Sequence, residues 1–575
     1  MEPSRKAQLS LALITLAVLA PFLNKQFNID DPLFLWTAQQ IAAHPSDPFG
    51  FSVNWTGVPE PMWHAMQNPP LCSCFIASVA SVFGWNEVTL HAAFLLWAVA
   101  AVLGTFTLGQ RFCRNLDFQS VRPAPKAFRA EESIPSNPSV RWHDRPKVYV
   151  PFAAALLTLF APAFFVSATS VMCDVMLLAF YVWSMELWIR GLDEKRWWLL
   201  ALAMLFVSAA VLTKYFGITL LPLLAVYTLA RDRRCWRQLL WFCFPIVAVA
   251  LYDFLSQAQY GHALFVSAAN YSREVAAKYE VPLPAQIFTG LAFVGGCIFS
   301  VAFFVPIRWR RFLIGAAILL FLALVAAFYF FVPRQSHYQL NNALICAEGA
   351  AFAAAGLGIL ALALIDLWRK RDADSLHLCL WVIGTFLFSI FFNWSITART
   401  ILPMVPAVAI LFARNFNWGR PSSAHWRLIA AAGLSLLLAA SDFREAQVVR
   451  KVTEVFRERF AAELGTVWFQ SHWGFQYYLQ QWGARPLNLA RSEIYSGDVM
   501  LIPANNTGVV PLSSDRIFPI EELTFPSFPS SPHMQPILGP GFTAVCTDRS
   551  PGRLIMCRQP NTIWPGFAEL RCATA

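Results

Sequence analysis

The stretch QLSLALITLAVLAPFLNKQFNIDDPLFLWTAQQI, residues 8–41, joins an apolar run to two adjacent carboxylates, Asp30 and Asp31. Residues 8–23 are long and apolar enough for a helix that crosses about 30 Å of hydrocarbon. Because no small-residue cleavage site follows this run, we interpret it as a retained membrane helix and not as a signal peptide. The stretch therefore predicts a membrane protein with acidic side chains directly beyond its first span.

The composition of the whole chain agrees with this interpretation. Of the 575 residues, 57% are hydrophobic and only 14% are charged, and the mean hydropathy is +0.49. Such a chain is too apolar for an ordinary soluble protein of this size. The net charge of +10 comes from Lys and Arg in short clusters between apolar runs, which indicates membrane topology and not a nucleic-acid partner. We therefore expect an all-α polytopic membrane protein.

Thirteen apolar runs have a length suited to membrane helices. The loops between them alternate in charge, because Lys and Arg concentrate in every second one. The positive-inside rule then predicts a cytoplasmic N-terminus and an outer location for everything after about residue 442. The expected spans are 8–23, 87–110, 149–167, 171–190, 197–213, 215–230, 237–255, 285–305, 312–332, 343–366, 376–392, 400–413 and 428–441.

This topology divides the chain into two expected domains. A membrane domain covers residues 1–441 and includes a first outer loop at 24–86 and a cytoplasmic loop at 111–147, while residues 442–575 form a small outer α/β domain. Short β-like runs such as GDVMLIPA and FTAVCT among Pro and Gly turns indicate its strands. Outside the cytoplasm, Cys546 and Cys557 can form a disulfide. The aromatic stretch at 465–483 suits either packing, which we favour, or stacking on sugar rings.

The first outer loop contains the acidic pair and several other polar side chains. The sequence PLFLWTAQQIAAHP (residues 32–45) has the spacing of an amphipathic helix along the membrane interface. Asp30 and Asp31 lie at its start, where a helix stabilises negative charge, and Asp31 before Pro32 is the better candidate for a capping residue. A cap alone does not explain two acids. Further along the loop are Glu60, His64 and Asn68, the last before two prolines that fix a bend.

Other polar side chains fall at the predicted outer ends of helices, on the same side as Asp30. An ionisable group at membrane depth is costly unless it is paired or faces a polar cavity, so each is a candidate functional residue. For Lys214 and Arg399, the alternative explanation is that the long side chain extends toward the membrane interface. The set consists of Asp174, Lys214, His337 and Arg399.

At these residues the chain resembles the GT-C superfamily of membrane glycosyltransferases, including the dolichyl-phosphate-mannose–protein mannosyltransferases and the lipid A aminoarabinose transferases. The resemblance extends from the first helix to about residue 413. It depends on the order and common side of several short motifs. These are the acidic pair, the interfacial helix, the bend at 68–71, Asp174, LTKY at 212–215 and ARTILPMVP at 398–406.

The resemblance implies transfer of a sugar from a polyprenyl-phosphate carrier to an acceptor on the outer face of the membrane, with inversion at the anomeric carbon. It makes Asp30 or Asp31 the general base for the acceptor hydroxyl, and we favour Asp30 because Asp31 is the better cap. Cations stabilise the departing lipid phosphate; the expected donor-binding residues are Lys214, Tyr215, Arg334, His337 and Arg399, with Asp174 in support.

The first-loop residues Glu60, His64 and Asn68 are expected to contact donor or acceptor. A divalent metal ion held by Asp30, Asp31 or Glu60 is a further expectation. Relatives often carry His or Lys where this chain has Asn68, and Asn68 does not neutralise a phosphate. This departure affects the expected details of carrier and metal binding.

Two other classes of protein stay open at this point. A secondary transporter would place its ionisable groups in broken helices near the bilayer midplane and would show internal repeats, whereas we find no convincing repeat. A non-catalytic assembly subunit would use the acidic pair for stability. The expected partners of an enzyme are a lipid-linked sugar donor, membrane lipid, and a lipid, glycan or protein acceptor. The general character of the sequence suggests a bacterial inner membrane.

Overall fold

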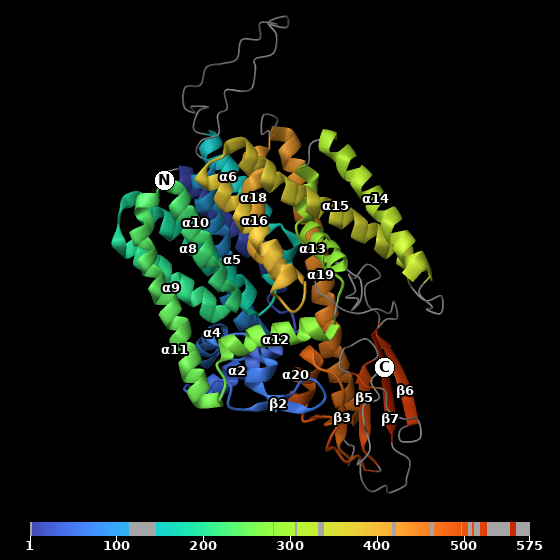
Figure 1. Ribbon diagram of the computed structural model, residues 1–575. Coiled ribbons are helices and arrows are strands. Elements are labelled where there is room, and N and C mark those ends of the chain that lie inside the picture. The colour runs from blue at the N-terminus through green and yellow to red at the C-terminus, as the bar shows by residue number, and fades with distance from the viewer. Residues whose placement is uncertain are drawn as a thin grey trace, which may run out of the picture.

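The protein is a bundle of long helices with a small β-sheet beside one end (Figure 1). This computed structural model describes residues 3–113, 145–279, 281–304, 307–331, 339–416, 421–460, 465–495, 497–503, 509–510, 518–525 and 552–558. Seven helical segments among them are long and apolar enough to cross a membrane, and they support the expected polytopic membrane protein. These segments are Pro3–Phe22, Glu87–Phe112, Cys173–Glu194, Arg233–Tyr260, Ala347–Lys370, Ala373–Phe391 and His425–Arg459.

Within the described residues, each expected span overlaps with at least one helix. Short 3₁₀ turns interrupt the bundle at Ala20–Phe22, Tyr215–Thr219, Arg233–Phe242, Phe299–Phe304 and Leu402–Met404. The helices of the bundle are α1 (Pro3–Leu19), α5 (Glu87–Phe112), α6 (Arg145–Leu159), α7 (Pro162–Ser167), α8 (Cys173–Glu194), α9 (Trp197–Thr213), α10 (Leu220–Arg231), α11 (Cys243–Tyr260), α12 (Leu264–Tyr279), α13 (Leu283–Cys297), α14 (Ile307–Phe331), α15 (Gln339–Lys370), α16 (Ala373–Phe391), α17 (Ala398–Ile401), α18 (Val405–Asn415) and α19 (Pro421–Phe460).

The observed helix ends differ from those of many expected spans, and two of these differences change the expected organisation. The run 149–167 is two helices, α6 and α7, because Pro162 has no amide proton to donate to the preceding turn and its ring clashes there. The run 428–441 is part of α19, which continues as one helix to Phe460. The expected domain boundary at residue 441 therefore lies within a helix.

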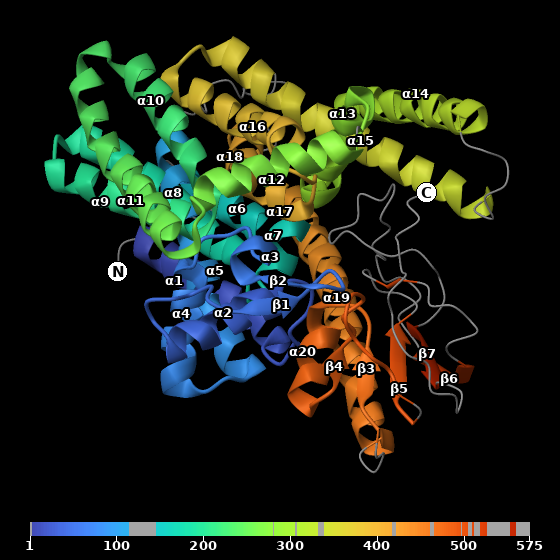
Figure 2. The ribbon, with the colours of Figure 1, turned by 60° about the horizontal axis from the view of Figure 1, so that its bottom comes forward.

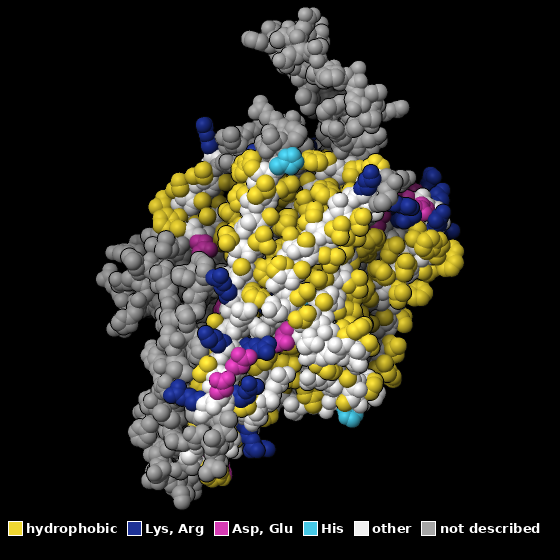
Figure 3. Space-filling view, turned by 180° about the vertical axis from the view of Figure 1, so that it is seen from behind, with side chains coloured by type: hydrophobic (Ala, Val, Ile, Leu, Met, Phe, Trp, Pro, Cys, Tyr) yellow, Lys and Arg dark blue, Asp and Glu magenta, His cyan; other side chains and the backbone are white. Residues whose placement is uncertain are grey.

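Local sequence signals explain where several helices begin. The side chain of Asn86 accepts a hydrogen bond from the amide of Thr89 at 2.9 Å and caps α5. Asp372 caps α16 in the same way, through the amide of Ser375 at 2.7 Å. Between their ends the helices are apolar all round, as expected for membrane segments. Figure 3 shows hydrophobic side chains over the middle of the bundle and charged side chains gathered nearer its ends.

The first outer loop is folded at one end of the bundle. It contains α2 (Asp31–Ala43), the hairpin of β1 (Ser52–Asn54) and β2 (Pro59–Pro61), α3 (Met62–Ala65) and α4 (Leu71–Phe83). Helix α2 forms where the sequence predicted it, but its first half is buried on all sides, unlike a helix that lies exposed along an interface. Helix α4, which the sequence analysis did not identify, packs against α2.

The residues after α19 form a mixed sheet with one helix. Its elements are β3 (Val467–Phe469), α20 (Trp473–Trp482), β4 (Arg485–Pro486), β5 (Val499–Pro503), β6 (Phe518–Phe525) and β7 (Gly552–Arg558). The strand order is β4-β3-β5-β7-β6; β3 runs parallel to β4 and β5, and β7 runs antiparallel to β5 and β6. The GDVMLIPA run supplies β5, whereas FTAVCT and Cys546 lie outside the described residues.

Helix α20 joins this C-terminal unit to the first loop. It packs against both α2 and α19, as Figure 2 shows. The Tyr477 side chain is buried in the same hydrophobic cluster as Phe27 and Phe34. The Tyr478 hydroxyl accepts a hydrogen bond from the Phe27 amide at 2.9 Å and donates one to Glu87 at 2.7 Å. Packing is thus the role of these α20 aromatic residues.

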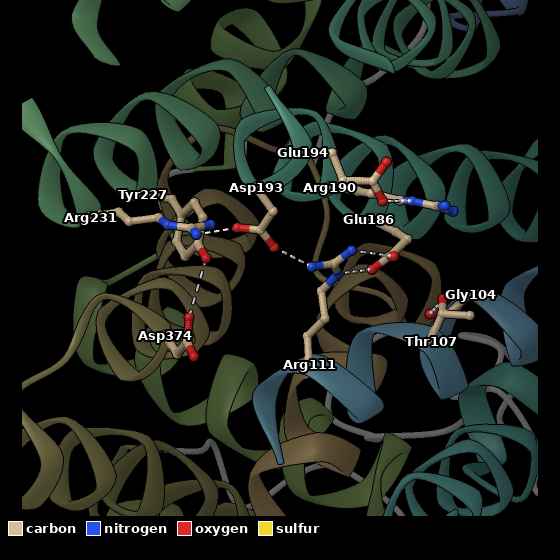
Figure 4. Close-up of polar contacts among 10 residues, drawn as sticks. All are labelled: Gly104, Thr107, Arg111, Glu186, Arg190, Asp193, Glu194, Tyr227, Arg231 and Asp374. Atoms are coloured by element: carbon tan, nitrogen blue, oxygen red, sulfur yellow. Dashed lines mark hydrogen bonds and ion pairs between the residues drawn. The ribbon is translucent and has the colours of Figure 1, made fainter. Parts of the chain in front are cut away.

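The opposite end of the bundle is tied together by charged side chains (Figure 4). Arg111 at the end of α5 binds Glu186 of α8 through two hydrogen bonds, of 2.6 and 2.9 Å, and Asp193 of α8 through a third at 2.6 Å. Asp193 also pairs with Arg231 of α10. Charge-assisted, bidentate contacts of this kind fix the relative positions of the helices that carry them.

Gly474 tests the docking of α20 on the first loop. A Cβ atom at this position would overlap with the carbonyl oxygen of Phe27, so Gly474→Ala forces the two backbones apart. We expect a loss of about 1–3 kcal/mol of stability, measured as a lower Tm in detergent. Gly433→Ala is the control, because open space surrounds that position in α19. An unchanged Tm for Gly474→Ala would contradict the docking.

Candidate active site

Asp31 is buried at the start of α2 and is held by two backbone amides. Its carboxylate oxygens accept hydrogen bonds from Asn28 at 3.0 Å and from Val171, which lies between α7 and α8, at 2.9 Å. The expectation that Asp31 caps the helix is wrong: α2 begins at Asp31 itself, Asp30 occupies the cap position, and the Asp30 side chain makes no capping bond. The Asp31 side chain instead points toward the α7–α8 connection.

Burial controls the protonation of Asp31, which is only 1% exposed. Loss of solvation raises its pKa to about 7, outweighing the Lys25 charge and the two amide hydrogen bonds, which lower the pKa. Near neutral pH the carboxyl group is therefore present in both protonated and charged forms. Because it is shielded from solvent, Asp31 is not the carboxylate that a substrate meets first.

Asp30 is the accessible member of the acidic pair. Its carboxylate forms an ion pair of 2.6 Å with Arg399 of α17, and the two side chains are 25% and 28% exposed. The other terminal nitrogen of Arg399 lies 3.1 Å from the sulfur of Met172. Ile29, directly before Asp30, has a φ of +50°, an unfavourable conformation for a β-branched residue. Strain of this kind is common beside functional groups.

Asp174 and Lys214 form a second ion pair on the same side. Asp174 lies in the first turn of α8, where the helix N-terminus stabilises its charge, and its carboxylate is 2.7 Å from the Lys214 amine. Lys214 follows α9 in an extended conformation and its side chain is 21% exposed. The negative charges of Asp30 and Asp174 both act on Arg399, so the two ion pairs form one cluster.

Tyr215 lies next to this cluster but points toward α11. Its hydroxyl donates to that of Tyr252 at 3.4 Å, and its ring packs on Phe265. Glu60 and His64, expected near the donor or acceptor, pair with each other at 2.5 Å, and the His64 ring contacts Tyr271 of α12.

Asn68, Arg334 and His337 are the remaining residues that the sequence predicts at the site. Asn68 lies in the bend between α3 and α4. Arg334 and His337 lie outside the described residues. The structure thus brings together Asp30, Asp31, Asp174, Lys214 and Arg399.

The sequence analysis did not assign a role to Lys25 or Asp442, which form a buried ion pair of 2.5 Å. The Lys25 amine also donates to the hydroxyls of Thr169 and Ser170 at 3.3 and 3.4 Å. These hydroxyls directly precede Val171 and Met172, the residues that contact Asp31 and Arg399. The available signal was the position of Lys25, a charged residue between an apolar helix and the acidic pair.

His472 from the C-terminal unit also approaches the site. Its ring stacks on Trp55 of the first loop with centroids 4.7 Å apart. Burial lowers its pKa to about 4, although the nearby charge of Asp30 and a hydrogen bond with the Trp55 backbone act in the opposite direction. The neighbouring Ser471 and Trp473 have φ values of +89° and +67°, so the backbone is strained on both sides of this histidine.

The expected metal ligands do not converge in this arrangement. Over the described parts of the chain, no three His, Cys, Asp or Glu side chains are close enough to hold a metal ion together. Asp30 is paired with Arg399, Asp31 accepts two amide hydrogen bonds, and Glu60 is paired with His64. The cations Arg399 and Lys214 are the groups here that suit an anionic ligand.

Residues 149–257 match the model of the dolichyl-phosphate-mannose-protein mannosyltransferase family. The chain resembles the GT-C superfamily of membrane glycosyltransferases. The matched residues lie between α6 and α11 and include Val171, Asp174 and Lys214. The resemblance inferred from the sequence motifs is confirmed over this segment, which contains the second ion pair of the GT-C-like site.

Three solved structures are similar to the chain. ArnT from Cupriavidus metallidurans, bound to undecaprenyl phosphate, is 13% identical, with a TM-score of 0.41 over 86% of this chain and 93% of its own. AglB from Archaeoglobus fulgidus, an oligosaccharyltransferase in complex with an inhibitory peptide and a dolichol-phosphate, is 13% identical, with a TM-score of 0.44 over 86% of this chain and 69% of its own. The arabinosyltransferase EmbB from Mycobacterium smegmatis is 14% identical, with a TM-score of 0.30 over 92% of this chain and 46% of its own.

None of the curated proteins matches the chain in sequence.

The raised pKa of Asp31 predicts how stability changes with pH. Because the folded-state pKa, about 7, exceeds the ordinary value of 3.8, the protonated form favours folding. This contribution is complete below about pH 4 and is lost as the pH rises through 7. A difference of this size corresponds to roughly 4 kcal/mol. We expect the Tm of Asp31→Asn, relative to wild type, to rise between pH 4 and pH 8. A constant difference in Tm would contradict the raised pKa.

Proposed function

We propose that the protein is an integral-membrane glycosyltransferase that transfers a sugar from a polyprenyl-phosphate carrier to an acceptor, with inversion at the anomeric carbon. The observation that carries this proposal is the partly exposed Asp30 carboxylate, held by Arg399 beside the Asp174–Lys214 pair. A carboxylate and two cations at one end of an apolar bundle suit a reaction between a sugar linked to a lipid phosphate and a neutral acceptor hydroxyl. The family match over residues 149–257 supports a lipid-linked donor.

Asp30 acts as the general base in this proposal. An acceptor hydroxyl attacks the anomeric carbon of the donor, and its proton passes to the Asp30 carboxylate. The bond between the anomeric carbon and the phosphate oxygen breaks, and its electron pair leaves with the polyprenyl phosphate. Attack from the face opposite the phosphate inverts the anomeric configuration. The ion pair with Arg399 fixes the position of the Asp30 carboxylate before the proton arrives.

Arg399 and Lys214 receive the departing phosphate. Each cation is paired with a carboxylate yet is more than one-fifth exposed, so each can also donate hydrogen bonds to a phosphate oxygen. A planar guanidinium suits two-point contact with phosphate, and an ammonium supplies a compact charge. These two residues stabilise the charge that develops on the leaving group.

The same proposal orients the chain in the membrane. The first loop and the C-terminal unit lie at one end of the bundle and the beginning of α1 lies at the other (Figure 1). Together with the basic loops, this arrangement supports a cytoplasmic N-terminus and an outer site, in a bacterial inner membrane. The acceptor is then a lipid, glycan or protein on the outer face. A divalent metal has no step in this proposal, because Arg399 and Lys214 supply the positive charge.

Replacing the base provides the direct test. In proteoliposomes with a panel of radiolabelled polyprenyl-phosphate sugars and envelope extract, we expect Asp30→Asn to reduce transfer at least 100-fold at matched expression, because the amide does not take the proton. Glu194→Gln, which breaks two partly exposed ion pairs at the opposite end, with Arg190 and Arg196, is the control and should retain activity. Transfer by Asp30→Asn at the wild-type rate would exclude this residue as the base.

The cation assigned to the leaving group gives a separate prediction. Lys214→Met leaves Asp30 in place but removes a positive charge. This charge stabilises the transition state more than the bound donor, because negative charge develops on the leaving phosphate as the bond breaks. We expect kcat for transfer to fall at least tenfold, and Lys214→Arg to recover part of it. Initial rates over a range of donor concentrations measure both kcat and the donor KM. A change in the donor KM alone would show that Lys214 contributes to binding and not to departure of the phosphate.

A further inference from the structure

The buried Lys25–Asp442 pair joins three distant parts of the chain. Lys25 lies between α1 and α2 and its side chain is 3% exposed, while the Asp442 side chain is 9% exposed. An ammonium group has three protons to donate. Here its partners are the Asp442 carboxylate at 2.5 Å and the hydroxyls of Thr169 and Ser170. The first loop, the α7–α8 connection and α19 thus meet at one amine.

The contacts continue without a gap from this amine to the reacting groups. The Thr169 and Ser170 hydroxyls bind Lys25, the next amide, of Val171, binds Asp31 at 2.9 Å, and the next side chain, Met172, contacts Arg399 at 3.1 Å. Four successive residues therefore connect a buried ion pair with both members of the acidic pair. None of these four residues bears a charge, so the position of the segment depends on the groups that it contacts.

Thr169, Ser170, Val171 and Met172 lie between α7 and α8. The Thr169 and Ser170 amides donate to the carbonyls of Val166 and Ser167 at the end of α7, at 3.0 and 3.3 Å. Beyond these turn contacts, the segment is held by hydrogen bonds with distant parts of the chain. The ammonium of Lys25 supplies two of them. Asp442, from α19, accepts a hydrogen bond from that ammonium at 2.5 Å and holds it in place within an apolar surrounding.

We propose that Lys25 and Asp442 are positioning residues, which hold the segment 169–172 and through it the orientation of Asp31, Arg399 and Asp30. This inference rests on the proposed function for its effect on catalysis. Neither residue touches the substrate in this proposal. Their pair sets the geometry in which Asp30 receives a proton and Arg399 receives a phosphate, and small displacements of such groups are costly in rate.

Single and double substitutions separate positioning from stability. Lys25→Met and Asp442→Asn each leave one buried charge without its partner, and both should lower the Tm. The double variant Lys25→Met/Asp442→Leu removes both charges and should recover most of the Tm. Its kcat should stay at least tenfold below wild type with the donor KM within threefold, because the hydrogen bonds with the segment 169–172 are still missing.

The matched control is the buried Arg414–Asp366 pair, whose side chains are 2% and 0% exposed. It joins α15 and α18 on the side of the bundle away from the acidic pair. Arg414→Met/Asp366→Leu should retain kcat within twofold of wild type. If the double variant of Lys25 and Asp442 recovers kcat together with Tm, its pair is only structural and the proposal is overturned.

Hydrogen–deuterium exchange gives a readout that does not depend on activity. In the full-length protein in detergent, peptides covering residues 166–174 should take up deuterium faster in Lys25→Met and in Lys25→Met/Asp442→Leu, and at the wild-type rate in the control. Unchanged deuterium uptake in both Lys25→Met and Lys25→Met/Asp442→Leu would overturn the proposal. If wild type transfers no sugar from any donor, the proposed function fails, and the exchange result alone decides whether Lys25 holds this segment.

Discussion

The hydrogen bond from the Val171 amide to Asp31 is the contact on which the arrangement of the site depends. It fixes the start of α2 against the connection between α7 and α8, and the groups on either side follow from it. Thr169 and Ser170 bind Lys25, Met172 contacts Arg399, and Asp174 pairs with Lys214. In an apolar bundle each charge needs a partner. Here the short segment 169–174 contacts Lys25, Asp31, Arg399 and Lys214.

The same segment separates two carboxylates that are adjacent in sequence. Asp31 faces the protein and exchanges its solvation for backbone amides, whereas Asp30 faces outward and meets Arg399. Two identical side chains thus have different environments, a common basis for dividing roles within one site. Ile29, directly before this pair, has a positive φ.

Local patterns in the sequence predicted the spans and the side on which the charged residues gather, because hydrophobic length and charge alternation act over short distances. They misjudged Asp31, because a helix-start signal does not reveal a partner such as Val171, 140 residues away. Neither did they indicate the pairing of Lys25 with Asp442, 417 residues away. The pairing of Glu60 with His64 is local, because the two residues lie four positions apart.

The shared core of the first loop and α20 has a consequence for the synthesis of the protein. The Phe27 amide reaches its partner Tyr478 only after 451 further residues have been added. At 5–20 residues per second this delay is roughly 20–90 s. The early helices enter the membrane while the first loop still lacks the surface that covers it. An incomplete chain therefore lacks the finished first loop, and the site is assembled only after α20 has been made.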